Sequence, residues 1–119
     1  MTTPAESFLG RWRISTVEGW EKSDVDLAGP AHIEFARRND GDFQFSAVTG
    51  QIDYRVSLEP DGPFIEWAWV GDDDGTEVSG RGWAHRVGEK LKGTIFVFGG
   101  DDFKFEASPL KPRRVSRGG

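Results

Sequence analysis

The stretch that decides the fold reads Thr76-Glu77-Val78-Ser79-Gly80-Arg81-Gly82-Trp83-Ala84-His85. Its residues alternate in character with the two-residue period of a β-strand. One face is small and smooth and carries Val78, Gly80, Gly82 and Ala84. The other face carries charge, an indole and an imidazole, from Glu77, Ser79, Arg81, Trp83 and His85. The alternation predicts a strand, and its second face gathers several groups that could handle a ligand.

Seven further stretches show a similar apolar alternation, and short turns rich in Gly, Asn and Asp separate most of them. The expected strands cover residues 8–18, 31–37, 42–48, 51–58, 64–70, 76–85, 90–98 and 103–107. The expected turns include Asn39-Asp40-Gly41, Thr49-Gly50 and the segments 60–63, 71–75, 88–89 and 99–102. Residues 19–30 form one long loop after the first strand, with a helical turn that Ser23 or Asp24 would cap.

Eight short strands joined in a meander predict an all-β fold, an eight-stranded antiparallel up-and-down barrel. Closure is favoured because it removes both exposed sheet edges. An open two-sheet sandwich is the alternative. A barrel of eight strands has an interior that side chains fill or that holds one small ligand. The position of any site therefore depends on which face of residues 76–85 points inward.

Composition limits the class of protein. The 119 residues fit one domain, and five Trp, nine Phe and one Tyr can supply its core. The chain contains no Cys, which excludes disulfides and thiolate metal sites. No run approaches the about 18 apolar residues of a membrane span, and residues 1–7 do not resemble a signal peptide. We expect a cytoplasmic protein that does not bind a membrane.

The charge is uneven along the chain, whose net charge is −5. The last ten residues contain four basic side chains and no acid: Lys111, Arg113, Arg114 and Arg117. We therefore expect one barrel domain over residues 1–109 and a basic, disordered tail over residues 110–119. The rest of the chain is acidic, so we expect no nucleic-acid partner.

Gly10-Arg11-Trp12, on the first expected strand, resembles the Gly-X-Trp signature of the calycins, the superfamily of lipocalins and avidins. The resemblance implies that Trp12 closes one end of the barrel beneath a basic residue from a late strand. Lys104 is the basic residue on the last expected strand.

A second resemblance covers residues 31–105. Segments 31–35, 50–56, 79–84 and 99–102 resemble parts of a group of short bacterial proteins. This resemblance implies the fold and a bacterial, cytosolic setting, and it assigns no catalytic residue.

A ligand site in the barrel is the sharpest functional hypothesis. Strands four, five and six are neighbours in a meander, and they carry the six candidate residues Arg55, Trp67, Trp69, Arg81, Trp83 and His85. If these face inward, they form an aromatic box with charged groups at its rim, in or at the mouth of the barrel. A guanidinium there would favour a carboxylate or phosphate on a small molecule. The competing interpretation places Arg55 with Asp53, and Arg81 with Glu77, outside as ion pairs.

Other activities have less support in the sequence. There is no Cys nucleophile, no Gly-x-Ser-x-Gly elbow and no glycine-rich phosphate loop, so we expect a protein without catalytic activity. His32 and His85 lack metal-ligand spacing, and we expect neither a metal nor a cofactor. The alternative function is a protein-interaction or homodimerisation module without a small-molecule ligand. Residues 64–70 are apolar on both faces, which requires a partner to cover the outer one.

Overall fold

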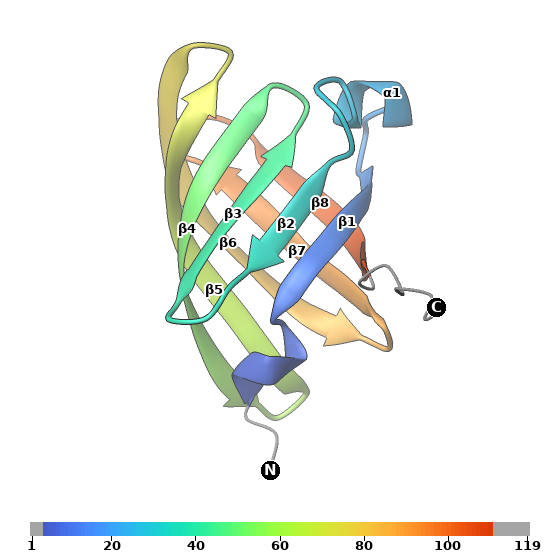
Figure 1. Ribbon diagram of the computed structural model, residues 1–119, viewed down its shortest axis with the longest axis vertical. Coiled ribbons are helices and arrows are strands. Elements are labelled where there is room, and N and C mark those ends of the chain that lie inside the picture. Colours follow the sequence, from blue (N-terminus) through green and yellow to red (C-terminus); the bar gives the residue numbers. More distant parts are fainter. Residues whose placement is uncertain (1–3, 111–119) are drawn as a thin grey trace, which may run out of the picture.

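The computed structural model describes residues 4–110, which form a closed antiparallel barrel (Figure 1). Each strand pairs with the next in the chain, and the last pairs with the first. The strands are β1 (Gly10–Val17), β2 (His32–Phe35), β3 (Asp40–Phe45), β4 (Val48–Glu59), β5 (Gly62–Asp73), β6 (Thr76–Val87), β7 (Lys90–Val97) and β8 (Asp102–Pro109). The predicted eight-stranded up-and-down barrel is confirmed. The expected tail lies outside the described residues from residue 111 onward.

Two expected turns lie elsewhere in the chain. The chain turns between β3 and β4 at Ser46, whose φ is 53°, and Gly50 instead lies inside β4. A Cβ at Gly50 would stand 2.4 Å from the ring of Phe43, so this glycine makes room for packing rather than for a turn. The preceding hairpin turns at Arg38 and Asn39, with φ of 67° and 65°. This turn therefore lies one residue earlier than the expected Asn39-Asp40-Gly41, and Asp40 and Gly41 belong to β3.

The barrel core is aromatic and explains why the smooth face of β6 points inward. Trp67 and Trp69 of β5 are buried, and in the antiparallel register they lie opposite Gly82 and Gly80. A Cβ at Gly82 would stand 2.3 Å from the Trp67 indole, so a side chain there would collide with the ring. The two large rings on β5 therefore require the small residues on β6. The polar and aromatic face of β6 is left outside.

Rings from other strands complete the core around the two indoles. The Phe35 ring lies 5.5 Å from Trp67, and the Phe43 ring lies 4.9 Å from Trp69, measured between centroids. Tyr54 packs edge-on against Phe35 and donates its hydroxyl hydrogen to the Ala36 carbonyl oxygen. Nine of the fifteen aromatic residues are buried in the core, whereas Trp20 and Phe98 are exposed.

Trp12 is buried at the end of the barrel that carries the short 3-10 helix η1 (Pro4–Ser7). Its indole Nε1 donates to the Phe8 carbonyl oxygen at 2.9 Å. The guanidinium of Arg86, near the end of β6, lies 5.6 Å from the Trp12 ring and donates to the Ser7 carbonyl oxygen. A basic residue from a late strand does cover this Trp, but it comes from β6. Lys104 of β8 is exposed.

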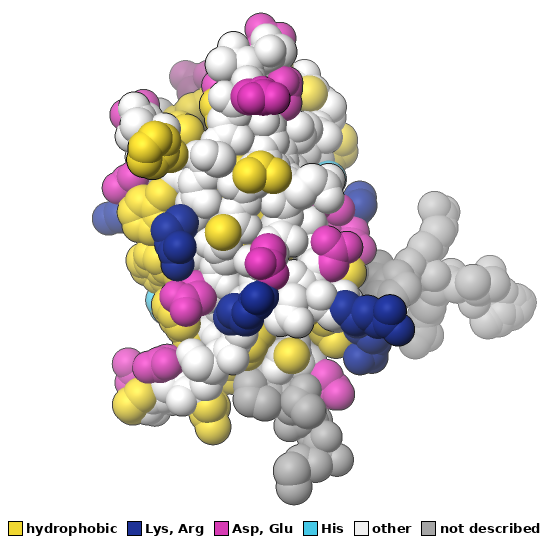
Figure 2. All heavy atoms as spheres, turned by 90° about the vertical axis from the view of Figure 1, so that its left-hand side faces the viewer, with side chains coloured by type: hydrophobic (Ala, Val, Ile, Leu, Met, Phe, Trp, Pro, Cys, Tyr) yellow, Lys and Arg dark blue, Asp and Glu magenta, His cyan; other side chains and the backbone are white. Residues whose placement is uncertain are grey.

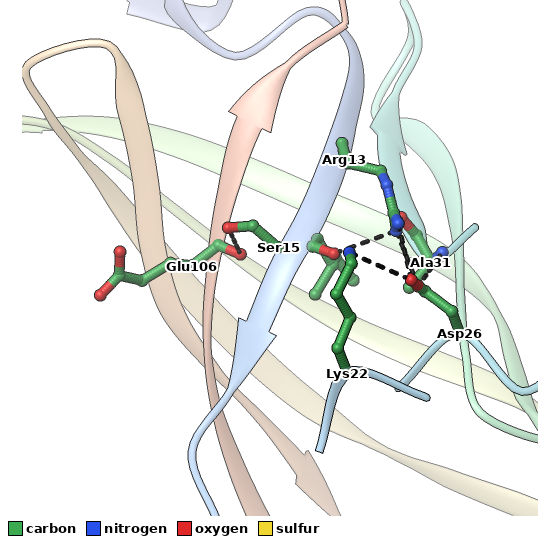
Figure 3. Close-up of polar contacts among 7 residues, drawn as sticks. Arg13, Ser15, Lys22, Asp26, Ala31 and Glu106 are labelled. Atoms are coloured by element: carbon green, nitrogen blue, oxygen red, sulfur yellow. Dashed lines mark hydrogen bonds and ion pairs between the residues drawn. The ribbon is translucent and has the colours of Figure 1, made fainter. Parts of the chain in front are cut away.

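The long loop after β1 lies at the other end of the barrel and contains the short helix α1 (Lys22–Val25) (Figure 1). Glu21 takes the N-cap position, rather than Ser23 or Asp24. Arg13 of β1 holds the loop through a bidentate pair with Asp26, at 2.8 and 2.6 Å (Figure 3). The hydrogen bond from Arg13 lowers the pKa of Asp26 far below its usual range. The loop is thus tied to the barrel wall by a charge-assisted contact.

Candidate functional site

The structure places the six predicted site residues on two sides of the barrel wall. Trp67 and Trp69 are buried in the interior. The other four, Arg55, Arg81, Trp83 and His85, lie on the outer surface of strands β4 and β6. The structure therefore does not form the single aromatic box that the sequence suggested. The reason is the cross-strand register, in which Trp67 and Trp69 lie opposite Gly82 and Gly80. Because side chains alternate along a strand, Arg81, Trp83 and His85 then point to the outer face.

The described part of the interior offers little to a charged ligand. Trp69 Nε1 is already bonded, because it donates to the Phe96 carbonyl oxygen at 3.1 Å. Trp67 Nε1 is buried without a hydrogen-bond partner. The one buried polar residue among those described is Thr94, which lies on the outer side of β7 between Gly93 and Ile95. The cationic side chain on the inner side of β6 is Arg86, which lies over Trp12, donates to the Ser7 and Gly88 carbonyl oxygens and has its Nε buried without a hydrogen-bond partner.

A ladder of three rings runs along the outside of β5 and β6. Phe64 and His85 are cross-strand partners, and Trp83 is two residues from His85 on the same face. The Trp83 and His85 rings are nearly parallel, at 10°, with centroids 6.1 Å apart. The Phe64 ring stacks on Trp83, at 24° and with centroids 6.1 Å apart. We call Phe64, Trp83 and His85 the outer ladder.

Apolar side chains continue this surface toward the other end of the barrel. Phe98, directly after β7, is 87% exposed, and Val70 of β5 is 63% exposed. Phe96 of β7 is half-buried and Ala68 of β5 is exposed. In Figure 2 hydrophobic side chains gather along the left edge of the face shown, with acidic and basic side chains among them. We call the outer ladder together with Ala68, Val70, Phe96 and Phe98 the outer wall.

Charged residues of both signs stand within the outer wall. Glu66 of β5 and Arg81 of β6 are exposed, and neither has an ion-pair partner among residues 4–110. Beside them, Arg55 pairs with Asp53 at 2.6 Å, as the competing interpretation expected. Arg81 makes no such pair with Glu77. The wall therefore presents one unpaired acid and one unpaired base next to its apolar surface.

Shallow grooves flank the outer ladder. One groove of about 570 Å³ runs along β7 between the rings of Trp83 and His85 and the side chains of Lys92 and Lys104. A second groove, of about 440 Å³, lies on the other side of Trp83 and is bounded by Arg81, Phe96 and Phe98. Both grooves are outside the barrel, and Trp83 forms the ridge between them. A surface with one aromatic ridge between two grooves has a shape that a protein partner can complement.

Other chemistry is sparse in the described residues. His32 Nε2 lies 2.8 Å from Asp42 Oδ1, a partly buried pair on the outside of β2 and β3. Between residues 4 and 110, no three His, Asp or Glu side chains come together as a metal ion would need. No helix in that range combines the length and apolar character that a membrane crossing requires.

Comparison of the chain with protein-family models, curated proteins and solved structures gives no match.

The sequence analysis did not name five residues of the outer wall as site candidates: Phe64, Ala68, Val70, Phe96 and Phe98. The sequence contains a signal for three of them, Phe64, Ala68 and Val70, since residues 64–70 are apolar on both faces. Phe98 gives no such signal, because its exposure depends on where β7 ends. It leaves the strand after Val97 and is held by a backbone hydrogen bond to Ser79.

Proposed function

We propose that this chain is a non-catalytic protein-interaction module whose binding surface is the outer wall. In this proposal the barrel is a rigid, calycin-like scaffold in a bacterial cytoplasm, and its aromatic lumen serves stability. The observation that carries the proposal is the exposure of Phe98 and Val70 next to a stacked aromatic ladder. Contiguous apolar surface of this kind on a soluble domain is characteristic of a partner site.

The composition of the wall supports a protein partner. Trp and Phe are enriched at the centres of interfaces, where they bury large areas at a small cost in side-chain entropy. Arg81 and Glu66 border the rings and can make hydrogen bonds or ion pairs with a partner. The outer wall extends along three strands, so a small molecule would contact only part of it. Binding of a small ligand inside the barrel has less support, since the cationic candidates are all outside.

Site-specific photocrosslinking tests the proposal in the cells that make the protein. A photoreactive benzoylphenylalanine at position 70 lies on the outer wall, and one at position 27 provides the matched control. Val70 and Leu27 are almost equally exposed, at 63% and 66%, but Leu27 lies in the loop after β1. We expect a discrete protein adduct from position 70 and none from position 27. Equal labelling at the two positions, or no adduct at either, would contradict the proposal.

Ligand titration tests the competing function. We expect the Trp fluorescence of the purified protein to be unchanged by a panel of small aromatic and anionic metabolites. A saturable change that Arg81→Ala abolishes, without loss of thermal stability, would support a small-molecule site instead.

A further inference from the structure

We infer that the partner of the outer wall is a second copy of this chain, docked about a two-fold axis that pairs Glu66 of each copy with Arg81 of the other. This inference rests on the proposed function and adds the identity of the partner and its register. Its basis is the placement of four outward residues on β5 and β6.

The register of β5 and β6 arranges these four residues as the corners of a rectangle. Glu66 lies opposite Trp83, and Ala68 lies opposite Arg81. Glu66 and Arg81 therefore occupy one diagonal, and Ala68 and Trp83 occupy the other. The residues between them, Trp67 and Gly82, point into the barrel, so all four corners belong to the outer surface.

A two-fold axis along the Ala68–Trp83 diagonal satisfies both charges at once. In a symmetric dimer, a residue that contacts a second residue of the partner is contacted by it in return. The axis exchanges the two ends of the other diagonal, so each Glu66 meets the Arg81 of the second copy. Two ion pairs form between groups that have no partner within residues 4–110 of one chain. Ala68 and Trp83, on the axis, meet their own counterparts.

The distribution of charge restricts the contact between two copies to the area around the rectangle. The chain carries a net charge of −5, so two copies repel each other across most of their surface. Around the rectangle the charges balance, with Arg55 and Arg81 against Asp53 and Glu66. This balanced area is where two acidic chains can approach, whereas a partner selected by the overall charge would be basic. The small Ala68 side chain also lets the two walls come close.

The available surface is sufficient. A stable interface takes about 800 Å² from each partner, which is about one tenth of the 7503 Å² surface of the described chain. The wall lies on β5 and β6, two of the three longest strands, and on β7 beside them. Phe98 and Val70, at 87% and 63% exposed, offer the largest apolar parts of that area. The outer edges of the half-buried Phe64, Trp83 and Phe96 add to it, together with the exposed Glu66, Ala68 and Arg81.

Charge reversal with mixing tests the register. Glu66→Arg alone and Arg81→Glu alone each place two pairs of like charges across the interface. We expect each to raise the dimer Kd at least about tenfold in sedimentation velocity. An equimolar mixture of the two variants restores opposite charges at both positions, and so does the double variant. We therefore expect both to return to within about threefold of the wild-type Kd.

Glu89→Arg provides the matched control, because it changes the net charge as Glu66→Arg does but lies in the turn between β6 and β7. We expect it to leave the Kd within about threefold of wild type, and we expect all variants to melt within a few degrees of wild type. The register would be wrong if neither single charge reversal changed the dimer Kd, or if the mixture of the two variants stayed dissociated. Either result would leave the outer wall as the proposed binding surface. A wild-type monomer up to millimolar concentration would overturn the second copy as partner. In that case we expect the crosslinked adduct at position 70 to have the mass of a complex with a different protein. The proposed function as an interaction module would then hold without the second copy.

Discussion

The indole of Trp83 lies almost parallel to the imidazole of His85 on the outside of the barrel, with an angle of 10° between the two rings. One residue earlier, at Gly82, the same strand has no side chain at all, because the Trp67 indole of β5 fills that place inside the barrel. The two indoles thus have opposite roles across one wall. Trp67 fixes the packing of β5 against β6, and Trp83 lies in the outer ladder.

Gly82→Ala tests whether the inner packing requires a glycine. A glycine in a strand interior is ordinarily replaced by Ala with a gain in stability of about 0.5–1 kcal/mol. Here the new methyl group would stand 2.3 Å from the Trp67 ring, so we expect a loss of about 1–3 kcal/mol. Urea denaturation measures the change. Ser79→Ala, on the outer face of the same strand, is the control, and a Gly82→Ala variant as stable as wild type would refute the packing explanation.

Comparing Trp69→Ala with Trp83→Ala tests which of the two side chains faces the interior of the barrel and which faces outward. Trp69 is buried and bonded to the Phe96 carbonyl oxygen, so its truncation leaves a cavity, and we expect a loss of about 3–5 kcal/mol. Trp83 stacks only on Phe64 and His85 on the outer side, so we expect its truncation to cost about 1 kcal/mol. Thermal and urea unfolding measure both. Equal losses would mean that the side chains are assigned to the wrong faces.

Asp26→Asn tests the anchor of the long loop and its pH dependence. The pKa of Asp26 is lowered in the folded protein by its hydrogen bonds with Arg13. A lowered folded pKa means that the ionised carboxylate adds stability above the unfolded value of about 3.9, and that this stability is lost as pH falls toward the folded pKa. At pH 7 we expect Asp26→Asn to cost about 1–2 kcal/mol, because the partly exposed pair is charge-assisted.

The same variant gives a pH profile. The difference in unfolding free energy between wild type and Asp26→Asn should be constant from pH 7 to about pH 5 and shrink below about pH 4. A difference that grows on acidification would contradict this assignment.

Phe98→Ser tests the most exposed residue of the outer wall. The side chain contributes almost nothing to the fold of one chain, since it is 87% exposed. We therefore expect an unchanged melting temperature but at least a tenfold rise in the dimer Kd, measured by light scattering over a dilution series. Leu27→Ser, another exposed apolar residue away from the wall, should change neither quantity. Similar effects of the two substitutions would remove Phe98 from the interface.

The sequence was sufficient to predict the barrel, because six hairpins with short turns follow one long loop in chain order and leave few alternatives. It left the inward face of β5 open, because residues 64–70 are apolar on both faces, and the structure places Ile65, Trp67 and Trp69 inside. It did not resolve the face of β6, where a smooth side and an aromatic side are both plausible inside a barrel. That choice depends on the cross-strand register, which sets Trp67 against Gly82 and excludes a second indole from the interior.

The turn near Gly50 shows the same limitation. A Thr-Gly pair is typical of turns, but this glycine lies within β4 because the Phe43 and Trp69 rings approach its backbone. Such a contact joins three strands and has no local signature in the chain. The cover over Trp12 is similar, because Arg86 reaches it from β6 only once the barrel has closed.

The most direct test of the outer wall as a self-association surface is a single engineered thiol. The chain has no Cys, so Ala68→Cys introduces the only one, at the outward position beside the inferred two-fold axis. A disulfide needs Cβ atoms about 3.5–4.5 Å apart, which two copies docked about this axis can provide. We predict rapid formation of a covalent dimer under mild oxidation for Ala68→Cys, and slow formation for Ala28→Cys in the exposed loop after β1. Equal, slow crosslinking of the two variants, at a concentration where the wild type is dimeric, would contradict the account.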